Sequence, residues 1–453
     1  MSQKKPQFYI QNETMGAIFI SFFMAVFIVA NLTIGFSWPL YLLAAGIGFV
    51  ISLIYPRSGL FSIVILTLIF ERFFTLQSFF INKAEYKFYL VDILILGIIG
   101  GIFFDYLNNK LNKKNRRNFL ESNDWFLICF ITLNVIYFIA SFFLNARFEL
   151  AFSTFKNYAF YSSFYFIAAY LIRDKETLIR LAKFFLSGAV VLIGFILFGI
   201  LNGTGLWTEY TPLSTTGVRI LAFTHGLYLT LALIILIAFL IYHKKQGLYP
   251  LLLAVWFLGI IGSMMRHLWI SLAATLILLY IFIPKLKKRN LFNLGMKVIF
   301  PFILIFLLTF FLSGEFPQSQ LSREIKSISG ALIERTASLG NTSDESFSWR
   351  NLAWLGAYDQ FKLNPFFGLG TGQKIYVEKE NYRDFVELRN IHNSYLAILF
   401  QLGAIGLFIF LLFIYKITRR LFRSIRCQIN PEYAYAILGA LSIYLIAFLF
   451  QPY

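Results

Sequence analysis

Residues 221–242 read LAFTHGLYLTLALIILIAFLIY, a run that contains no Asp, Glu, Lys or Arg. An α-helix rises about 1.5 Å per residue, so about twenty apolar residues cross roughly 30 Å of hydrocarbon. Arg219 precedes the run, and Lys244 and Lys245 follow it. The sequence therefore predicts a membrane-spanning helix with a cation close to each end.

Similar apolar runs recur along all 453 residues, of which 58% are hydrophobic and 55 are Phe. This composition predicts an all-α fold, a polytopic transmembrane bundle of about twelve or thirteen spans in a single integral membrane domain over residues 1–453. The predicted spans are residues 16–35, 38–55, 59–80, 89–106, 124–144, 157–172, 181–201, 221–242, 249–264, 267–283, 295–312, 392–415 and 432–451.

Lys and Arg gather in every second loop between these spans. Short cytoplasmic loops retain positive charge, so we expect these loops and the N-terminus on the cytoplasmic side. The cations are Lys4, Lys5, Arg57, Lys110, Lys113, Lys114, Arg116, Arg117, Arg173, Lys175, Lys244, Lys245, Lys285, Lys287, Lys288, Arg289, Arg419, Arg420, Arg423 and Arg426. The net charge of +18 is then mainly a topology signal that also suits an anionic lipid bilayer surface, and no nucleic-acid partner is expected.

One segment, residues 313–391, departs from membrane composition and contains Ser, Asn, Glu, Lys and Gly in ordinary globular proportions. The order of the spans predicts that this loop is extracytoplasmic. Within it, residues 348–363 place apolar side chains close to helical spacing, which predicts a short helix along the membrane interface. Pro365 and a glycine-rich turn end that helix.

Arg219, Arg266, Arg350 and Arg389 lie on the predicted outer side, where the insertion bias disfavours cations. An arginine near a span end can simply extend to the headgroups. Polar neighbours weigh against that interpretation, because Arg219 follows a polar stretch and Arg266 is followed by His267. Guanidinium groups bind phosphate oxygens in a bidentate geometry, so several on one face are expected to bind a diphosphate.

His392 begins the span after the large loop. A histidine in that place is often only an interfacial or capping residue, and Asn393 and Ser394, which follow it, are of capping type. A neutral imidazole is also the usual general base for a sugar hydroxyl. His392 is therefore the candidate catalytic residue.

The same stretches resemble a known family. His392-Asn393-Ser394-Tyr395-Leu396, followed by Gly403 and Gly406, is similar to the HN-x-[YF]-L…G-x-x-G signature of the O-antigen ligase and O-antigen polymerase superfamily. Its R-x-x-x-W-x-x-A…P-x-x-G-x-G pattern resembles Arg350 to Ala357 and Pro365 to Gly370, and its G-x-R and S-x-S-R elements resemble Gly217-Val218-Arg219 and Gly262 to Arg266. The resemblance covers residues 217–413, and His267 departs from it because the family usually has a small residue there.

This resemblance implies a glycosyltransferase of the bacterial inner membrane that takes its glycan from an undecaprenyl-diphosphate carrier on the extracytoplasmic face. A ligase would use a lipid A core as acceptor and a polymerase a lipid-linked repeat unit; both stay open, with the ligase-like assignment preferred. Arg219 and Arg266, with Arg350 or Arg389, would stabilise the leaving diphosphate. His392 would accept the proton of the acceptor hydroxyl or orient that hydroxyl.

Aromatic side chains near the outer face complete the candidate site. Trp207, Tyr210 and Trp349 are the candidates for sugar stacking, and Asn393 for contact with the acceptor. The first outer loop, residues 35–38, has no acidic residue that could hold a divalent ion. We therefore expect no metal and no cofactor.

A lipid-linked glycan flippase or transporter is the alternative from another class of protein. Such a protein is expected to line a central path with charged residues. Glu71, Arg72 and Asp92 lie in or near apolar segments, where we expect ion pairs within the bundle. The motifs of the large outer loop favour the transferase.

Overall fold

A computed structural model describes residues 7–75, 79–81, 84–86, 89–111, 124–143, 146–208, 219–243, 247–315, 320–337, 345–379, 382–388 and 391–450. It is mostly helical, and the spans predicted from the sequence fall largely on helices. The span predicted over residues 59–80 departs most, because its main helix ends at Phe70 and residues 79–81 form a β-strand. Five of the described helices are long and apolar enough to cross a membrane, and six shorter apolar helices accompany them. The chain is a multi-span helical membrane protein, as predicted.

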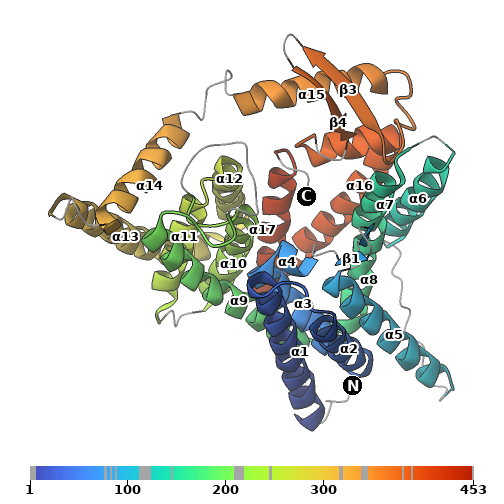
Figure 1. The fold of residues 1–453 in the computed structure, drawn as a ribbon. Helices are drawn as coiled ribbons and strands as arrows, with labels where there is room; N and C mark the ends of the chain where they lie inside the picture. The colour runs from blue at the N-terminus through green and yellow to red at the C-terminus, as the bar shows by residue number, and fades with distance from the viewer. Residues whose placement is uncertain are drawn as a thin grey trace. The chain divides into compact units, whose positions relative to one another are not determined.

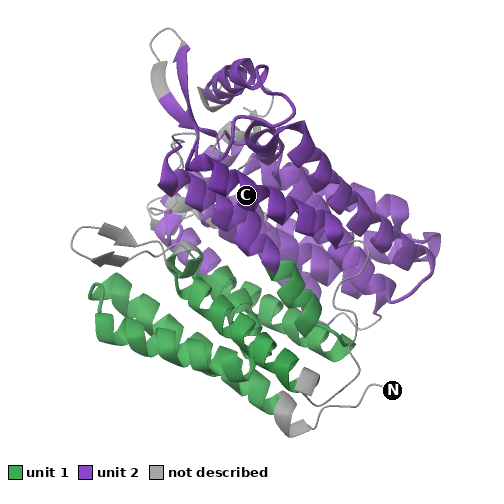
Figure 2. Cartoon of the chain, turned by 90° about the vertical axis from the view of Figure 1, so that its right-hand side faces the viewer, with its two compact units in different colours: residues 1–119, 164–194 green, residues 120–163, 195–453 purple. Residues whose placement is uncertain are grey.

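The chain divides into two compact units, residues 1–119 with 164–194 and residues 120–163 with 195–453 (Figure 2). Each unit consists mainly of apolar helices, which Figure 1 labels in chain order. A single integral membrane domain over residues 1–453 stays a prediction.

Unit 1 packs its helices closely through glycines. A Cβ atom on Gly97 would lie only 2.8 Å from the Phe49 carbonyl oxygen, so this glycine lets two helix backbones approach each other. The elements of unit 1 are α1 (Gln7–Thr33), α2 (Trp38–Ile54), α3 (Pro56–Phe70), α4 (Arg72–Thr75), β1 (Phe79–Ile81), β2 (Ala84–Tyr86), α5 (Leu90–Leu111), α8 (Phe164–Leu171) and the first part of α9 (Lys175–Asn202).

A buried carboxylate joins three helices of unit 1. Glu13 of α1 is 1% exposed and lies 3.4 Å from Nη1 of Arg57 and 3.0 Å from Nη1 of Arg180. Arg57 also donates from Nε to the Leu171 carbonyl, at 3.0 Å. A buried charge is costly without partners, so removing either arginine would destabilise this contact between α1, α3 and α9.

Two other buried acids lie at helix ends. Glu71 ends α3 with a φ of 51°, and Asp92 accepts a hydrogen bond of 2.9 Å from the Tyr89 N–H at the start of α5. The Asp92 contact is half of a capping box, in which a side chain in the first turn satisfies the N–H before the helix. The side chain of Arg72 lies outside the described part, and the ion pairs expected for these residues stay a prediction.

Unit 2 contains the predicted site. Its elements are α6 (Trp125–Ser141), α7 (Phe148–Phe155), the π-helix η1 (Lys156–Phe160), the 3₁₀-helix η2 (Tyr161–Ser163), the end of α9, α10 (Phe223–Tyr242), α11 (Tyr249–Gly262), α12 (Arg266–Phe282), α13 (Lys285–Glu315), α14 (Gln320–Ala337), α15 (Glu345–Phe361), β3 (Lys374–Lys379), β4 (Tyr382–Glu387), α16 (Ser394–Arg426) and α17 (Pro431–Ala447).

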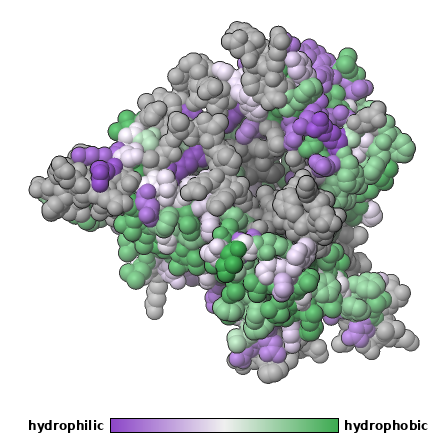
Figure 3. Space-filling model, viewed as in Figure 1, coloured by the Kyte–Doolittle hydropathy of each residue, from purple (hydrophilic) through white to green (hydrophobic). Residues whose placement is uncertain are grey.

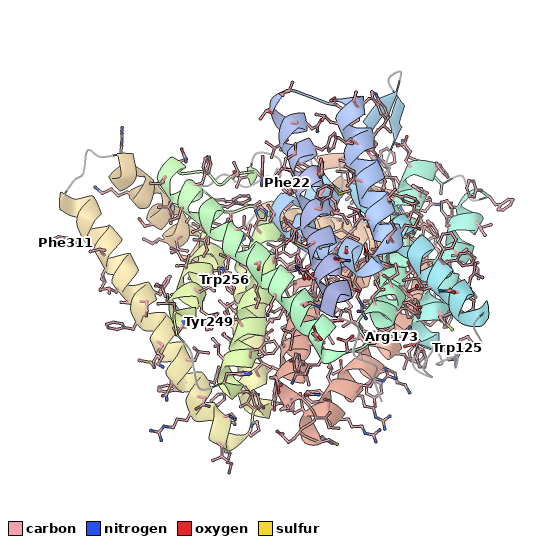
Figure 4. All side chains as sticks on the ribbon, turned by 90° about the horizontal axis from the view of Figure 1, so that it is seen from below. Phe22, Trp125, Arg173, Tyr249, Trp256 and Phe311 are labelled. Atoms are coloured by element: carbon pink, nitrogen blue, oxygen red, sulfur yellow. The ribbon has the colours of Figure 1, made fainter. Side chains whose placement is uncertain are left out.

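The apolar side chains divide between a core and an exposed belt. Trp256 of α11 is fully buried, where α11 packs against α10 and α13, whereas Phe311 of α13 is 63% exposed (Figure 4). Exposed apolar residues also cover much of the helical surface seen in Figure 3. Side chains of this kind suit contact with lipid tails.

The predicted span over residues 157–172 is not a regular α-helix throughout. Residues 156–160 form a π-helix and residues 161–163 a 3₁₀-helix before α8 begins at Phe164. The Ser163 hydroxyl donates to the carbonyl of Phe160, three residues earlier, at 2.5 Å. This spacing matches the three residues per turn of a 3₁₀-helix.

The large loop contains a small α/β element as well as helices. The helix predicted over residues 348–363 is confirmed as α15, and the antiparallel hairpin β3–β4 packs on it (Figure 1). Ala353 and Ala357 of α15 share one buried cluster with Ile375 and Val386 of the hairpin and with Phe400 of α16. This hairpin was not predicted from the sequence.

Candidate functional site

Arg219 is positioned by three glycines. Ile220, its neighbour, is 2% exposed, and a Cβ atom on Gly199, Gly205 or Gly262 would collide with it. Two backbone hydrogen bonds complete this glycine socket: the Gly205 N–H donates to the Arg219 carbonyl at 2.5 Å, and the Ile220 N–H donates to the Gly262 carbonyl at 2.9 Å. Arg219 is therefore held beside the end of α11.

The turn from α11 to α12 brings Arg266 to the same place. Met264 has a φ of 57°, and the Ser263 hydroxyl and the Trp269 indole N–H both donate to the Ile260 carbonyl, at 2.7 and 3.1 Å. Arg266 is the first residue of α12. The N-terminus of a helix carries partial positive charge, so this end of α12 favours an anion.

His392 lies at the junction of the large loop and α16. The indole N–H of Trp354 donates to the Ile391 carbonyl at 2.6 Å, and the Trp349 ring meets the His392 ring edge to face at 5.4 Å. On the other side, Asn393 caps α16 by accepting the Leu396 N–H at 3.0 Å. The side chains of α15 and the start of α16 therefore hold His392 between them.

These segments converge on His267, the second residue of α12. Arg350, Arg219 and His392 each lie close enough to act electrostatically on its imidazole. His267 is 8% exposed, and its ring lies 6.4 Å from Phe223 and 6.3 Å from Phe450, between ring centroids. The structure thus brings two predicted arginines and the predicted histidine together beside Arg266.

The remaining predicted residues differ in their placement. Trp349 joins the cluster through His392, whereas the described ring contact of Trp207 is with Phe195, at 6.3 Å. Asn393 uses its side chain as a helix cap, so a contact with the acceptor stays a prediction. Arg389 and Tyr210 lie outside the described residues.

His267 was not among the predicted site residues. Its position directly after Arg266 could have indicated that it belongs to the site, because the two residues begin the same helix. From the sequence, His267 was interpreted as a polar neighbour of Arg266 and as a departure from the family pattern.

The glycine motifs of the site region dock against each other. Gly403 interrupts α16 with a φ of 71°, and the segment from Pro365 to Gly370 enters the interruption. The Leu369 and Gly370 N–H groups donate to the Phe400 and Gln401 carbonyls, at 2.7 and 3.1 Å. The Ala404 N–H donates back to the Pro365 carbonyl at 2.9 Å. We refer to these contacts as the glycine dock; it fixes the large loop to α16 three turns below His392.

Among the residues that the structure describes, no three His, Cys, Asp or Glu side chains gather closely enough to hold a metal ion. Metal independence nevertheless stays a prediction.

Residues 251–411 match the family model described as O-antigen ligase. This stretch is an O-antigen ligase domain. It contains Arg266, Arg350, His392 and both halves of the glycine dock, whereas Arg219 precedes it. Among curated proteins, none matches the chain. The O-antigen ligase domain places the chain among the multi-pass membrane proteins of bacterial envelope-polysaccharide synthesis, and it implies a lipid-linked glycan as substrate.

Proposed function

We propose that the protein transfers a glycan from an undecaprenyl-diphosphate carrier to a sugar hydroxyl on the extracytoplasmic face of the inner membrane, as an O-antigen ligase does. The observation that carries this proposal is the convergence of Arg219, Arg350 and His392 on His267, beside Arg266. Cations for a diphosphate and a base for a hydroxyl lie together in that cluster.

The transfer needs one bond to form and one to break. The acceptor oxygen attacks the anomeric carbon, and the bond from that carbon to the diphosphate oxygen breaks, so its electron pair leaves with the lipid diphosphate. A ring nitrogen of His392 accepts the acceptor proton. The negative charge that grows on the leaving diphosphate is the quantity to be stabilised in the transition state.

Arginines suit this task without a metal ion. Arg219 and Arg266 approach from the glycine socket and from the N-terminus of α12, where the helix end adds its own partial positive charge. Arg350, and Arg389 from outside the described residues, would supply further donors. Fixed guanidinium forks can bind two phosphate oxygens each.

The acceptor is the open part of the proposal. We favour a lipid A core, the acceptor of a ligase, over a second lipid-linked repeat unit, the acceptor of a polymerase. A deletion strain complemented with the protein distinguishes them, because a ligase yields glycan attached to lipid A and a polymerase yields long chains still on the carrier.

Arg219→Lys and Arg266→Lys test the proposed diphosphate contact. A lysine keeps the charge but not the bidentate fork, so each variant should lose at least tenfold in transfer rate. The measurement is transfer of glycan from the purified lipid-linked donor by reconstituted protein, at matched amounts of enzyme. An arginine that only reaches the headgroups would tolerate lysine, so wild-type rates in both variants would refute the diphosphate contact.

The same assay tests metal independence. We expect a chelator to leave the rate unchanged, since arginines would stabilise the leaving diphosphate. Loss of activity on chelation, restored by a divalent ion, would contradict this part of the proposal.

A further inference from the structure

The last turns of α16 are strongly basic. The apolar part of this helix ends near Tyr415, and the residues beyond it extend the helix by roughly 15 Å, at about 1.5 Å per residue. Five cations lie on this extension: Lys416, Arg419, Arg420, Arg423 and Arg426. An amphipathic helical end of this kind lies at the depth of the lipid headgroups when the apolar part crosses the membrane.

These cations border a groove of about 860 Å³. Tyr415, Thr418, Phe422 and Cys427 line it together with them. Ligand sites in proteins commonly enclose about 300–1,000 Å³, so the groove is large enough for a polar headgroup and the first part of an acyl chain. The residues that line it combine positive charge with aromatic surface, as such a ligand requires.

The apolar side of this helical end is packed, which leaves the cations on the open side. Phe422 meets Phe282 of α12 with ring centroids 4.7 Å apart, and Ile425 is 6% exposed. Lys416 lies over the Phe126 ring of α6, at 5.7 Å, next to Trp125, which is 58% exposed. An exposed tryptophan at a helix end is typical of the membrane interface.

Two simpler explanations account for positive charge in this place. Cations orient a membrane protein, and they also stabilise the C-terminus of a helix. Both effects need only charge and are satisfied equally by lysine. Here four of the five cations are arginines, and they border one groove. Arginine binds phosphate oxygens in a bidentate geometry that lysine cannot reproduce.

We propose that this basic groove binds the phosphate-bearing headgroup of an anionic phospholipid. The proposal rests on the groove alone and not on the transfer reaction proposed above. In the orientation predicted from the sequence, the lipid would belong to the cytoplasmic leaflet, whose surface is negative. Bound lipid would neutralise repulsion among the arginines and fix the end of α16 against α6 and α12.

Lipid retention by the purified full-length protein tests this proposal. Native mass spectrometry in detergent, with phosphatidylglycerol or phosphatidylcholine added, should show preferential retention of phosphatidylglycerol. A cation near an anionic lipid surface contributes about fivefold in affinity, so Arg419→Gln, Arg423→Gln and Arg426→Gln together should weaken retention on the order of a hundredfold. The corresponding triple Arg→Lys variant preserves charge and orientation, and should still lose severalfold because it lacks the fork.

The matched control removes three exposed cations of unit 1 that lie in α9 or just before it: Arg173→Gln, Lys175→Gln and Lys183→Gln. Its retention of phosphatidylglycerol should equal that of the wild type. Equal retention by the wild type and the triple Arg→Lys variant would show that positive charge alone explains lipid retention, and would overturn the proposal. Displacement of the lipid by millimolar inorganic phosphate would assign the groove to a free anion and overturn it too. Neither result depends on whether the protein transfers glycans.

Discussion

His392 has a left-handed backbone, with a φ of 55°. A non-glycine residue in such a conformation commonly costs about 1–3 kcal/mol, so neighbouring contacts must hold it there. Trp354 holds the Ile391 carbonyl before it, and the Ser394 N–H after it donates to the Phe448 carbonyl at 2.8 Å. The imidazole is thus positioned by both neighbours before any substrate arrives.

His392→Ala should lower transfer by about 10²–10⁴, the usual contribution of a general base. The protein should still be inserted, because Asn393 and not His392 caps α16. His392→Gln keeps hydrogen bonding without basicity and should be nearly as slow. Rates are measured with matched amounts of folded protein. A fast Gln variant would mean that His392 orients the acceptor, and a fast Ala variant would mean that it has no part in the reaction.

His267→Leu should raise the KM for the lipid-linked donor severalfold, because the imidazole lies among the charges of Arg219, Arg350 and His392 and helps to position them. The thermal unfolding temperature should change little, since leucine fills a similar volume. His267→Gln should recover most of the affinity for the donor. A lower unfolding temperature with unchanged kinetics would show that His267 only packs.

The sequence predicted the individual arginines and His392, because cations on the outer side violate a general bias. It did not predict that His267 is the point where they meet. That arrangement depends on the glycine socket, in which Gly199, Gly205 and Gly262 approach Ile220 from separate segments. Contacts between such distant glycines leave no local pattern in a single sequence.

At the scale of elements, α16 is two helices joined at Gly403. A Cβ atom there would meet the Phe366 backbone, and the φ of 71° adds strain for any other residue. From the sequence, Gly403 was noted as part of the family signature. In the structure this glycine admits a loop segment into the helix.

Gly403→Ala should therefore lower the thermal unfolding temperature, because the backbone at φ 71° and ψ −176° is essentially restricted to glycine and costs another residue about 1–3 kcal/mol, and the glycine dock must also open. The measurement is the thermal unfolding temperature in detergent by fluorescence size-exclusion chromatography. Gly295→Ala in α13 is the control, because a Cβ atom at Gly295 meets nothing within 4 Å. The glycine dock would be unimportant if both variants unfolded at the wild-type temperature.

The sequence of the hairpin β3–β4 contains the alternation of apolar and polar side chains that is typical of a strand, but the run lies within a polar loop. Ile375 and Val377 are buried while Tyr376 between them is 45% exposed, the two-residue period of a strand. The run is short and lies in a polar loop of a helical protein, so the alternation alone did not predict a strand. Only the packing of Val386 and Ile375 against α15 makes the pattern meaningful.

At the scale of the whole molecule, the spans were predictable because the hydrocarbon excludes charge. Most of the long apolar runs fall on helices in the described part of the chain. The ends of spans were less predictable where a backbone feature decides them. Glu71, for example, ends α3 at Phe70, ten residues before the predicted end of that span.

Orientation is predicted from the loop charges, and cysteine labelling measures it. In a background without Cys129 and Cys427, single cysteines at positions 319 and 341 should react with an impermeant thiol reagent in intact cells. The reason is that the loop over residues 313–391 lies between spans whose other connections are basic. Labelling only after permeabilisation would reverse the orientation and remove the proposed site from the outer face.

The glycine dock has one more consequence, for how such a protein diversifies. Its hydrogen bonds join residues 369–370 to residues 400–401, and the hairpin lies in the chain segment between these two sites, which we call the excursion. Doubling the length of a flexible excursion adds only about 0.6 kcal/mol to its closure. Residues inserted between Lys379 and Tyr382 would therefore add little to the free energy of closing this excursion, and the His392 imidazole would keep its place.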